Sequence, residues 1–277
     1  MELLKRILNF YINSSIHVAL AAYAFTWVTL IQFGLAYNAN ILYFVFFATI
    51  TGYNFVKYFG VAKFHHRSLA GWLKAIQVFS LMSFIAMCYY AYGFKVNTLL
   101  ILSVSGLITF LYAIPLLPMT YFRDPQKNLR QISGLKIYVI ALVWMGTTVL
   151  LPLIENNVSL GSDAVITSMQ RFIFVIVLML PFEIRDLNYD SLKLATIPQK
   201  IGVRNTKISS VLLLIVFFVL DYFKDELTKN LILSTLIIVV MTLLFAVFSN
   251  KNQSKYFSAF WVEGLPIVWL IILLMLG

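Results

Sequence analysis

Runs of mostly apolar residues, each about twenty residues long, recur along nearly the whole chain. A run of that length matches the α-helix that is needed to cross the hydrocarbon core of a lipid bilayer. We distinguish nine such segments, at approximately residues 14–37, 40–59, 71–92, 97–118, 132–154, 163–182, 207–223, 228–248 and 256–277. The runs lack the alternation of barrel strands, and backbone groups in lipid must pair within their own segment. The sequence therefore predicts an all-α, polytopic membrane protein with nine transmembrane helices.

Charged residues are few and lie mainly between these segments. They make up 12% of the chain against 61% hydrophobic residues, too few to cover the surface of a water-soluble domain. No segment is long or polar enough to form a second domain, so residues 1–277 are expected to form one transmembrane domain in contact with the lipid bilayer. The single cysteine, Cys88, lies in an apolar run, where we expect it to be buried, and an intramolecular disulfide is excluded.

The basic residues predict the orientation in the membrane. Of the 21 Lys and Arg residues, seventeen fall on the side of the N-terminus and three on the opposite side. The remaining one, Arg171, lies in the sixth segment, where its side chain is expected to snorkel to the outer interface. The positive-inside rule makes the N-terminus cytoplasmic, in what we expect to be a bacterial cytoplasmic (inner) membrane. The net charge of +10 has the same explanation, so no nucleic-acid partner is inferred.

Three acids follow one another at the cytoplasmic end of the sixth segment. Glu183, Asp186 and Asp190 are spaced i, i+3 and i+7, which places them on one face if the helix continues. Carboxylates on one stripe repel one another unless a cation holds them, and Mg²⁺ binds one or two carboxylates together with substrate phosphates. The residues thus predict a magnesium site. The alternative is a solvated helix end whose acids pair with Arg185 and Lys193.

The residues that follow these acids resemble a known family. Asp186-x3-Asp190, followed by Thr196-Ile197-Pro198 and Gly202, resembles the second aspartate motif of the UbiA family of intramembrane prenyltransferases. Further matches are Tyr112-Ala113-Ile114-Pro115-Leu116, Gly134-Leu135-Lys136 and Trp144. The layout of the spans agrees over nearly the whole chain, whereas the motif matches lie between Tyr112 and Gly202.

The resemblance implies both a fold and an activity. The fold is a bundle of nine helices around a central cavity, where Mg²⁺ on two aspartate motifs holds an isoprenyl diphosphate. Ionisation of the allylic C–O bond is followed by attack of an acceptor, commonly an aromatic ring, and the metal stabilises the departing diphosphate. The expected partners are a prenyl diphosphate and a membrane-soluble acceptor, which the sequence does not identify. From their place around the matched motifs, the expected substrate-binding residues include Tyr112, Arg123, Lys127, Arg130, Lys136 and Lys200.

The chain departs from the family at the first aspartate motif. In the matching stretch, residues 53–62, Asn54 fits, but Phe55, Tyr58 and Ala62 stand at the acidic positions. No acid occurs between Glu2 and Asp124. The first of the two metal-binding motifs is therefore missing.

Basic residues stand in that region instead. Lys57 and Arg67 can bind a diphosphate directly through charge-assisted hydrogen bonds. Asn54 and Lys57 lie three residues apart, hence on one helical face, which we expect to look toward Asp186. The prediction is one Mg²⁺ on the acidic stripe, with Lys57 in place of a second ion. The alternative is that these are ordinary basic residues of a cytoplasmic loop.

Two functions remain open at this point. The first is a prenyltransferase in which Asp186, Asp190 and Lys57 are catalytic, with Asn54 and Arg67 among the substrate ligands. The second is a non-catalytic relative that binds a prenyl or lipid diphosphate or partners an active enzyme. A transporter is disfavoured, because the middles of the spans carry few polar residues. Glu263, near the inner end of the last segment, is expected either to pair with a base in the cavity or to reach the interface.

Overall fold

The computed structural model describes residues 2–64, 71–113, 134–188, 195–225 and 227–277. In these ranges the chain forms helices with short connections, and none of the described residues forms a strand. The helices are α1 (Glu2–Asn13), α2 (Ile16–Gln32), α3 (Ala39–Phe64), α4 (Gly71–Ala91), α5 (Val96–Ala113), α6 (Leu135–Met145), the π-helix η3 (Gly146–Leu150), α7 (Leu151–Glu155), α8 (Ser162–Asp186), α9 (Ile197–Val219), the 3₁₀-helix η5 (Leu220–Phe223), α10 (Lys229–Phe248), the π-helix η6 (Phe257–Val262) and α11 (Leu265–Leu276). The predicted all-α class is confirmed.

Several of these helices are long enough to cross a bilayer. Seven helical stretches among the described residues have the required length and apolar composition. An eighth results if α1 and α2, which are bent by 55° at the break between them, form one span. In α5 the apolar stretch Val96–Leu111 is shorter than the others. The multi-pass architecture is confirmed, whereas length and composition of the described helices do not reach the predicted count of nine.

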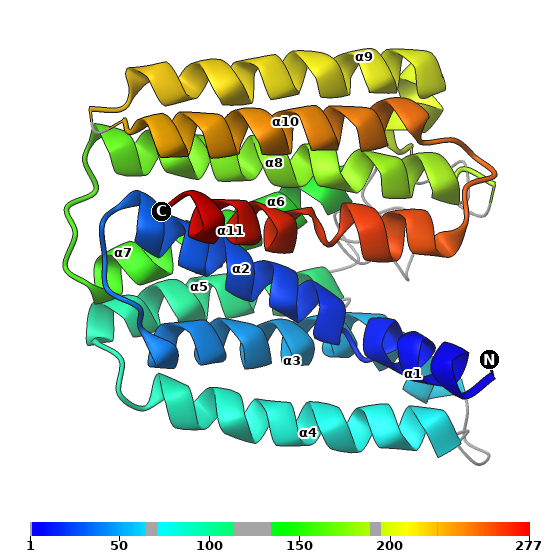
Figure 1. The fold of residues 1–277 in the computed structure, drawn as a ribbon. Coiled ribbons are helices and arrows are strands. Elements are labelled where there is room, and N and C mark those ends of the chain that lie inside the picture. The colour runs from blue at the N-terminus through cyan, green and yellow to red at the C-terminus, as the bar shows by residue number, and fades with distance from the viewer. Residues whose placement is uncertain (1, 65–70, 114–133, 189–194, 226) are drawn as a thin grey trace, which may run out of the picture.

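The helices lie side by side in one bundle (Figure 1). α2 packs against α3 and α11, and α11 continues the contacts through α10 to α9 and α8. On the other side α8 packs on α6, α6 on α5 and α5 on α3, while α4 covers the outside of α3. Figure 1 places the two termini at opposite ends of the bundle.

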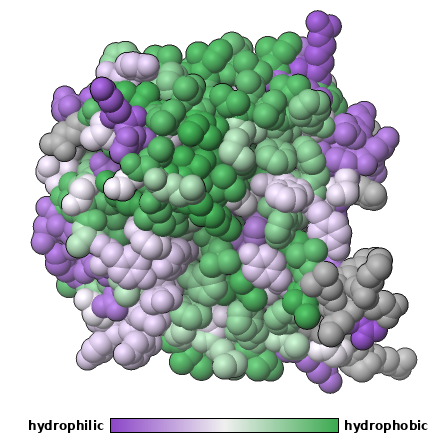
Figure 2. Space-filling model, viewed as in Figure 1, coloured by the Kyte–Doolittle hydropathy of each residue, from purple (hydrophilic) through white to green (hydrophobic). Residues whose placement is uncertain are grey.

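The side of the bundle is apolar. Figure 2 shows hydrophobic side chains over the middle of the visible face, with most hydrophilic ones toward its left and right edges, where the helices end. On α4, Leu81 and Met82 are 60% and 63% exposed, as expected for side chains that face lipid. Cys88 of the same helix is exposed as well. The prediction that Cys88 is buried is therefore wrong, because α4 contacts mainly α3 and leaves its other face free.

Aromatic side chains fill the centre between α2, α8, α9 and α11. The ring of Phe25 lies 5.7 Å from Phe174 and 6.0 Å from Trp269, and Phe217 lies 5.0 Å from Phe174. All four side chains are buried. Aromatic pairs at such distances contribute about 0.5–1.5 kcal/mol each beyond the burial of their area. Where the resemblance implied a central cavity, the middle of the bundle is thus occupied by packed rings.

Candidate functional site

Polar side chains from several helices gather around the break between α1 and α2. Ser15 adopts a left-handed conformation with φ 66°, which turns the chain from one helix into the other. Such a conformation is unfavourable for a residue with a Cβ and persists where the surroundings hold it. We call the surrounding residues the break cluster: Tyr11, Asn13, Ser14, Ser15, His17, Asn54, Lys57, Tyr58, Ser80, Arg185, Asp186, Ser258 and Glu263.

Asn54 of α3 fastens the break. Its Oδ1 accepts a hydrogen bond from Ser15 Oγ at 2.8 Å. Its Nδ2 donates to the Ser14 carbonyl at 3.0 Å and to Ser80 Oγ of α4 at 2.8 Å. The side chain is 3% exposed, and both of its N–H donors are used within the protein. Asn54 was predicted to bind substrate; its bonds instead give it a role in joining α1, α2, α3 and α4.

Lys57 lies on the same face of α3 as Asn54, as predicted. Its Nζ donates to the Asn13 carbonyl at 3.1 Å, and the Tyr58 hydroxyl donates to the same oxygen at 2.9 Å. Asn13 ends α1, where the exposed carbonyls carry the negative end of the helix dipole and favour a cation. The hydrogen bond of Lys57 therefore goes to the break, and the expected direct approach to Asp186 is not among its bonds to described residues.

Glu263 approaches Lys57 from the last helical stretch. It follows η6, where its N–H donates to the Ser258 carbonyl five residues earlier at 3.1 Å. Such π-turns occur frequently at functional sites. The partly buried carboxylate interacts electrostatically with Lys57 and Arg185. This interaction favours the first of the two alternatives drawn from the sequence, in which Glu263 pairs with a basic residue.

Arg185 and Asp186 complete the charged part of the cluster. Arg185 Nε donates to Asp186 Oδ1 at 2.7 Å, and Arg185 Nη1 donates to Ser258 Oγ at 2.7 Å. Asp186 Oδ2 makes no bond to another described residue. The four charges of Lys57, Glu263, Arg185 and Asp186 alternate in sign and formally cancel.

His17 ties the start of α2 to η6. Its Nε2 donates to the Phe260 carbonyl at 2.8 Å, which assigns the proton to Nε2 because a carbonyl only accepts. Its Nδ1 then accepts from the Tyr11 hydroxyl at 2.8 Å. Gly264 permits this approach, since a Cβ there would lie 2.8 Å from the Phe260 carbonyl and 3.3 Å from His17 Nε2.

Glu183 and Asp186 lie three residues apart in α8, and α8 ends at Asp186. Asp190 lies outside the described residues, so the predicted alignment of all three acids stays a prediction. Glu183 is 2% exposed, and its Oε2 accepts from the backbone N–H of Ile197 at 3.2 Å. Ile197 begins α9, and a carboxylate is favoured there by the free N–H groups and the helix dipole. The start of α9 thus binds one oxygen of the Glu183 carboxylate.

The remaining predicted residues are only partly described. Lys200 is exposed at the start of α9 near Gly134, where a Cβ would lie 3.8 Å from the Lys200 Nζ. Lys136 is half-buried in the first turn of α6, which begins at the same corner. Trp144 Nε1 donates to the Tyr53 hydroxyl at 2.9 Å. Asp190, Arg67, Arg123, Lys127 and Arg130 lie outside the described residues, and Tyr112 belongs to α5 but its side chain is not described.

The carboxylates offer a limited fit to a divalent cation. Among the described residues no group of three or more His, Cys, Asp or Glu side chains could hold a metal ion. Asp186 has one oxygen open, whereas Glu183 is buried against α9. A magnesium site of the predicted kind therefore depends on Asp186 together with Asp190.

His17 was not singled out in the sequence, and Glu263 was left between two alternatives. Glu263 is an acid within an apolar run, which is itself a signal of function in membrane proteins. His17, at the start of the first apolar run, carries the same signal in weaker form. The sequence allowed a basic partner for Glu263 but could not identify Lys57 or Arg185, because these contacts join distant parts of the chain.

Comparison with known proteins gives one full-length likeness in fold. No protein-family model matches the chain, and no curated protein matches it in sequence. A solved structure of a digeranylgeranylglyceryl phosphate synthase, from a study of this enzyme in membranes, is similar with a TM-score of 0.57. The match covers 100% of this chain and 97% of the other, at 15% sequence identity. At this identity the likeness shows the fold alone.

Proposed function

We propose that this chain transfers an isoprenyl group from a prenyl diphosphate to a membrane-soluble acceptor. The observation that carries the proposal is the likeness of the whole chain to the digeranylgeranylglyceryl phosphate synthase structure. The name of that enzyme denotes a glyceryl phosphate that bears two geranylgeranyl groups, which are isoprenyl chains. The acceptor of this chain is open, and both an aromatic ring and a glyceryl phosphate lipid are candidates.

Lys57 and Arg185 are the described cations best placed to bind the diphosphate. Both belong to the break cluster and interact with Glu263. A diphosphate offers more negative charge than one carboxylate, and its oxygens match the fork of an Arg guanidinium. We propose that the substrate takes the place of Glu263 and Asp186 as partner of these two side chains. Lys200 at the start of α9 is a further candidate ligand, as are the basic residues Arg67, Arg123, Lys127 and Arg130, which lie outside the described residues.

Asp186 and Asp190 are the proposed ligands of one Mg²⁺. Exchange of Arg185 from Asp186 to the diphosphate would leave both oxygens of the Asp186 carboxylate for a cation. Mg²⁺ suits one or two carboxylates combined with phosphate oxygens. When bound, it would supply charge stabilisation for the leaving diphosphate.

A second candidate function is binding of a prenyl or lipid diphosphate without transfer, alone or as partner of an active enzyme. It is favoured by the pairing of the described acids with protein groups, Glu183 with the Ile197 N–H and Asp186 with Arg185. In this reading Lys57 and Arg185 would still hold the phosphates. The two candidates differ in whether the allylic C–O bond is broken.

The test uses the detergent-purified full chain with labelled prenyl diphosphates of several chain lengths. Each is incubated with Mg²⁺ or with a chelator, and with either a hydroxybenzoate or a prenylglyceryl phosphate as acceptor. We expect Mg²⁺-dependent diphosphate release and a prenylated acceptor. Binding without release would favour the second candidate, and no binding under either condition would reject both.

A matched pair of variants separates the site from general effects of charge. Asp186→Asn keeps the size of the side chain and should abolish Mg²⁺-dependent release. Asp225→Asn alters an exposed acid that bonds Ser162 and lies far along the sequence from the break cluster, so release should persist. Equal losses in both variants would contradict the assignment of Asp186.

A further inference from the structure

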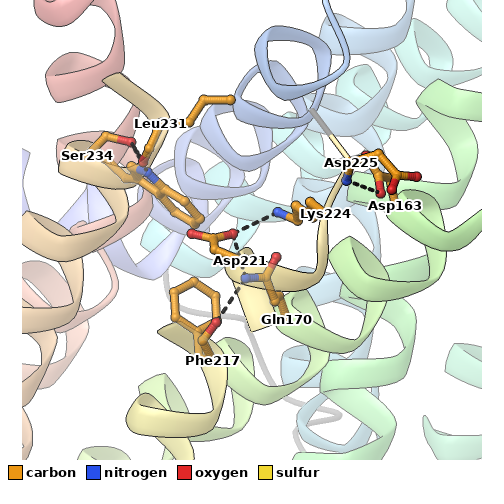
Figure 3. Close-up of polar contacts among 9 residues, drawn as sticks. Asp163, Gln170, Phe217, Asp221, Lys224, Asp225, Leu231 and Ser234 are labelled. Atoms are coloured by element: carbon orange, nitrogen blue, oxygen red, sulfur yellow. Dashed lines mark hydrogen bonds and ion pairs between the residues drawn. The ribbon is translucent and has the colours of Figure 1, made fainter. Parts of the chain in front are cut away.

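A second polar region lies where α2 and η5 end and α8 and α10 begin. Figure 3 shows Asp221 of η5 between Gln170 of α8 and Lys224. Asp221 Oδ1 accepts from Gln170 Nε2 at 2.8 Å and from Lys224 Nζ at 2.9 Å. Gln170 Nε2 also donates to the Phe217 carbonyl at 2.9 Å. These bonds fasten the end of α9 to α8.

Arg171, the next residue of α8, points into the bundle. Its guanidinium carbon lies 3.9 Å from the centre of the Phe25 ring, and its Nη2 donates to Thr29 Oγ1 at 3.0 Å. The Thr29 hydroxyl in turn donates to the Thr148 carbonyl in η3 at 2.8 Å. Arg171 is 3% exposed, so the prediction that it snorkels to the interface is wrong. The aromatic rings and the Thr29 hydroxyl hold it inside.

Two small cavities lie between these networks. Their volumes are about 20 and 10 Å³, and Gln32 and Thr167 line both. Four buried polar atoms of the lining residues have no hydrogen-bond partner in the protein: Gln32 Oε1, Thr167 Oγ1, Arg171 Nη1 and Asp221 Oδ2. A buried polar atom without a partner is strongly unfavourable, so a cavity flanked by four of them points to a ligand.

The size and the charge of the site select its ligand. A water molecule needs about 10–15 Å³ of such space and two to four polar partners, which these volumes supply for one or two molecules. The orphan atoms comprise two acceptors, one donor and one hydroxyl that does either, which matches the two donors and two acceptors of water. Arg171 and Lys224 oppose a cation, while Gln32 Oε1 and Asp221 Oδ2 oppose an anion.

We infer that these cavities form a water-binding site that bridges Gln32, Thr167, Arg171 and Asp221. The bound water completes the hydrogen bonding of Arg171 Nη1 and Asp221 Oδ2, which have no partner in the protein. It also links α2, α8 and η5 at the end of the bundle away from the break cluster. The bound water therefore stabilises the packing of these helices at this end of the bundle. This role is independent of the proposed transferase reaction.

The test relies on the change in the midpoint of thermal unfolding, which should differ in sign between a hydrated and a dry cavity. Thr167→Val keeps the shape of the side chain and removes the hydroxyl. With bridging water the midpoint of thermal unfolding of the detergent-purified full chain should fall by a few degrees. Without water the same change removes an unsatisfied hydroxyl, and an unchanged or higher midpoint would overturn the inference.

Thr242→Val is the matched control. Thr242 is buried in α10, and its hydroxyl donates to the Ile238 carbonyl of its own helix at 2.7 Å. Its loss should leave the midpoint nearly unchanged, so a fall as large as that of Thr167→Val would also overturn the inference.

A double-mutant cycle with Gln32→Met tests whether one ligand joins the two side chains. Substitutions of residues that share a ligand do not have additive effects on stability. The double variant should therefore lose less stability than the sum of the losses of the two single variants. Additive losses would overturn the shared site. Thr167→Ser keeps the hydroxyl and should restore the energetic coupling between residues 167 and 32. If the Ser variant instead behaves like the Val variant, the fall in the unfolding midpoint is caused by packing.

An exchange of salts separates water from a specific ion. Replacing NaCl by choline gluconate at equal ionic strength should leave the midpoint of the wild-type chain unchanged. A fall on removal of sodium or chloride alone would assign the site to that ion and overturn the inference of water.

Discussion

At the scale of single residues, Lys57 combines two tasks. Its ammonium group donates to the last carbonyl of α1 and also interacts electrostatically with the carboxylate of Glu263. A ligand that takes over this ammonium group competes with both partners. The binding strength of a diphosphate should therefore depend on Lys57 and on the charge that neutralises it.

Replacing Lys57 by Ala should weaken prenyl diphosphate binding by about 1–3 kcal/mol, the usual loss when one partner of a charge-assisted contact is removed. Equilibrium binding of a labelled prenyl diphosphate to the purified chain measures this. Lys207→Ala is the control, since Lys207 also donates to a helix carbonyl, that of Val247, at 2.7 Å. Equal effects of the two variants, or none for Lys57→Ala, would show that Lys57 is purely structural.

Glu263→Gln should have the opposite effect. Removal of the carboxylate charge frees Lys57 and Arg185 from an internal competitor, so the prenyl diphosphate should bind several-fold more tightly. The same binding assay detects the change, with Glu155→Gln as control. Glu155 is paired instead with Thr98 Oγ1 at 2.6 Å and with the Lys95 backbone. Weaker binding of Glu263→Gln would indicate that the carboxylate contributes to the ligand site and does not compete with it.

At the scale of elements, the start of α9 depends on one glycine. Gly202 has φ 79° and ψ 162°, which separates the short turn at Ile197 from the long helix that follows. A side chain is strongly disfavoured in this conformation. Glu183, which bonds the Ile197 N–H, holds the same turn against α8. The segment that resembles the second aspartate motif is thus shaped by backbone geometry as well as by its acids.

Gly202→Ala should lower the free energy of unfolding by about 1–3 kcal/mol. Gly106→Ala is the control, because Gly106 lies inside α5 and a Cβ there meets nothing within 4 Å. In a helix interior this change should be neutral or stabilising by up to about 1 kcal/mol. Thermal unfolding of the two purified variants should therefore shift in different directions, and a stabilised Gly202→Ala would contradict the assigned backbone geometry.

At the scale of the whole molecule, the basic residues predict which end of the bundle faces the cytoplasm. Cys88 is first replaced by Ala, since it is exposed. Single cysteines are then introduced at Ser254, between α10 and η6, and at Ser159, between α7 and α8; both residues are exposed. A membrane-impermeant thiol reagent added to intact cells should label Ser159→Cys only. Labelling of Ser254→Cys from outside would reverse the predicted orientation.

The sequence allowed the fold class to be predicted, because apolar runs of span length leave a chain in lipid little choice but helices. It also placed Asn54 and Lys57 on one face of α3. It misjudged Arg171 and did not foresee the contact of Glu183 with α9, since spacing along a helix cannot reveal partners supplied by another one. Thr29 and Phe25 hold Arg171 from α2, and the start of α9 takes up Glu183. The pairing of Lys57 with Glu263 depends on tertiary packing in the same way.

The bond between His17 and the Phe260 carbonyl joins residues 243 positions apart. At a synthesis rate of about 5–20 residues per second, the start of α2 exists for roughly 10–50 s before its partner is made. During that time Lys57 also lacks Glu263, with which it interacts electrostatically in the folded protein. Completion of the break cluster therefore has to wait until η6 and Glu263 have been made. A protein truncated before η6 should lack the bonds that Phe260 and Ser258 supply to His17 and Arg185.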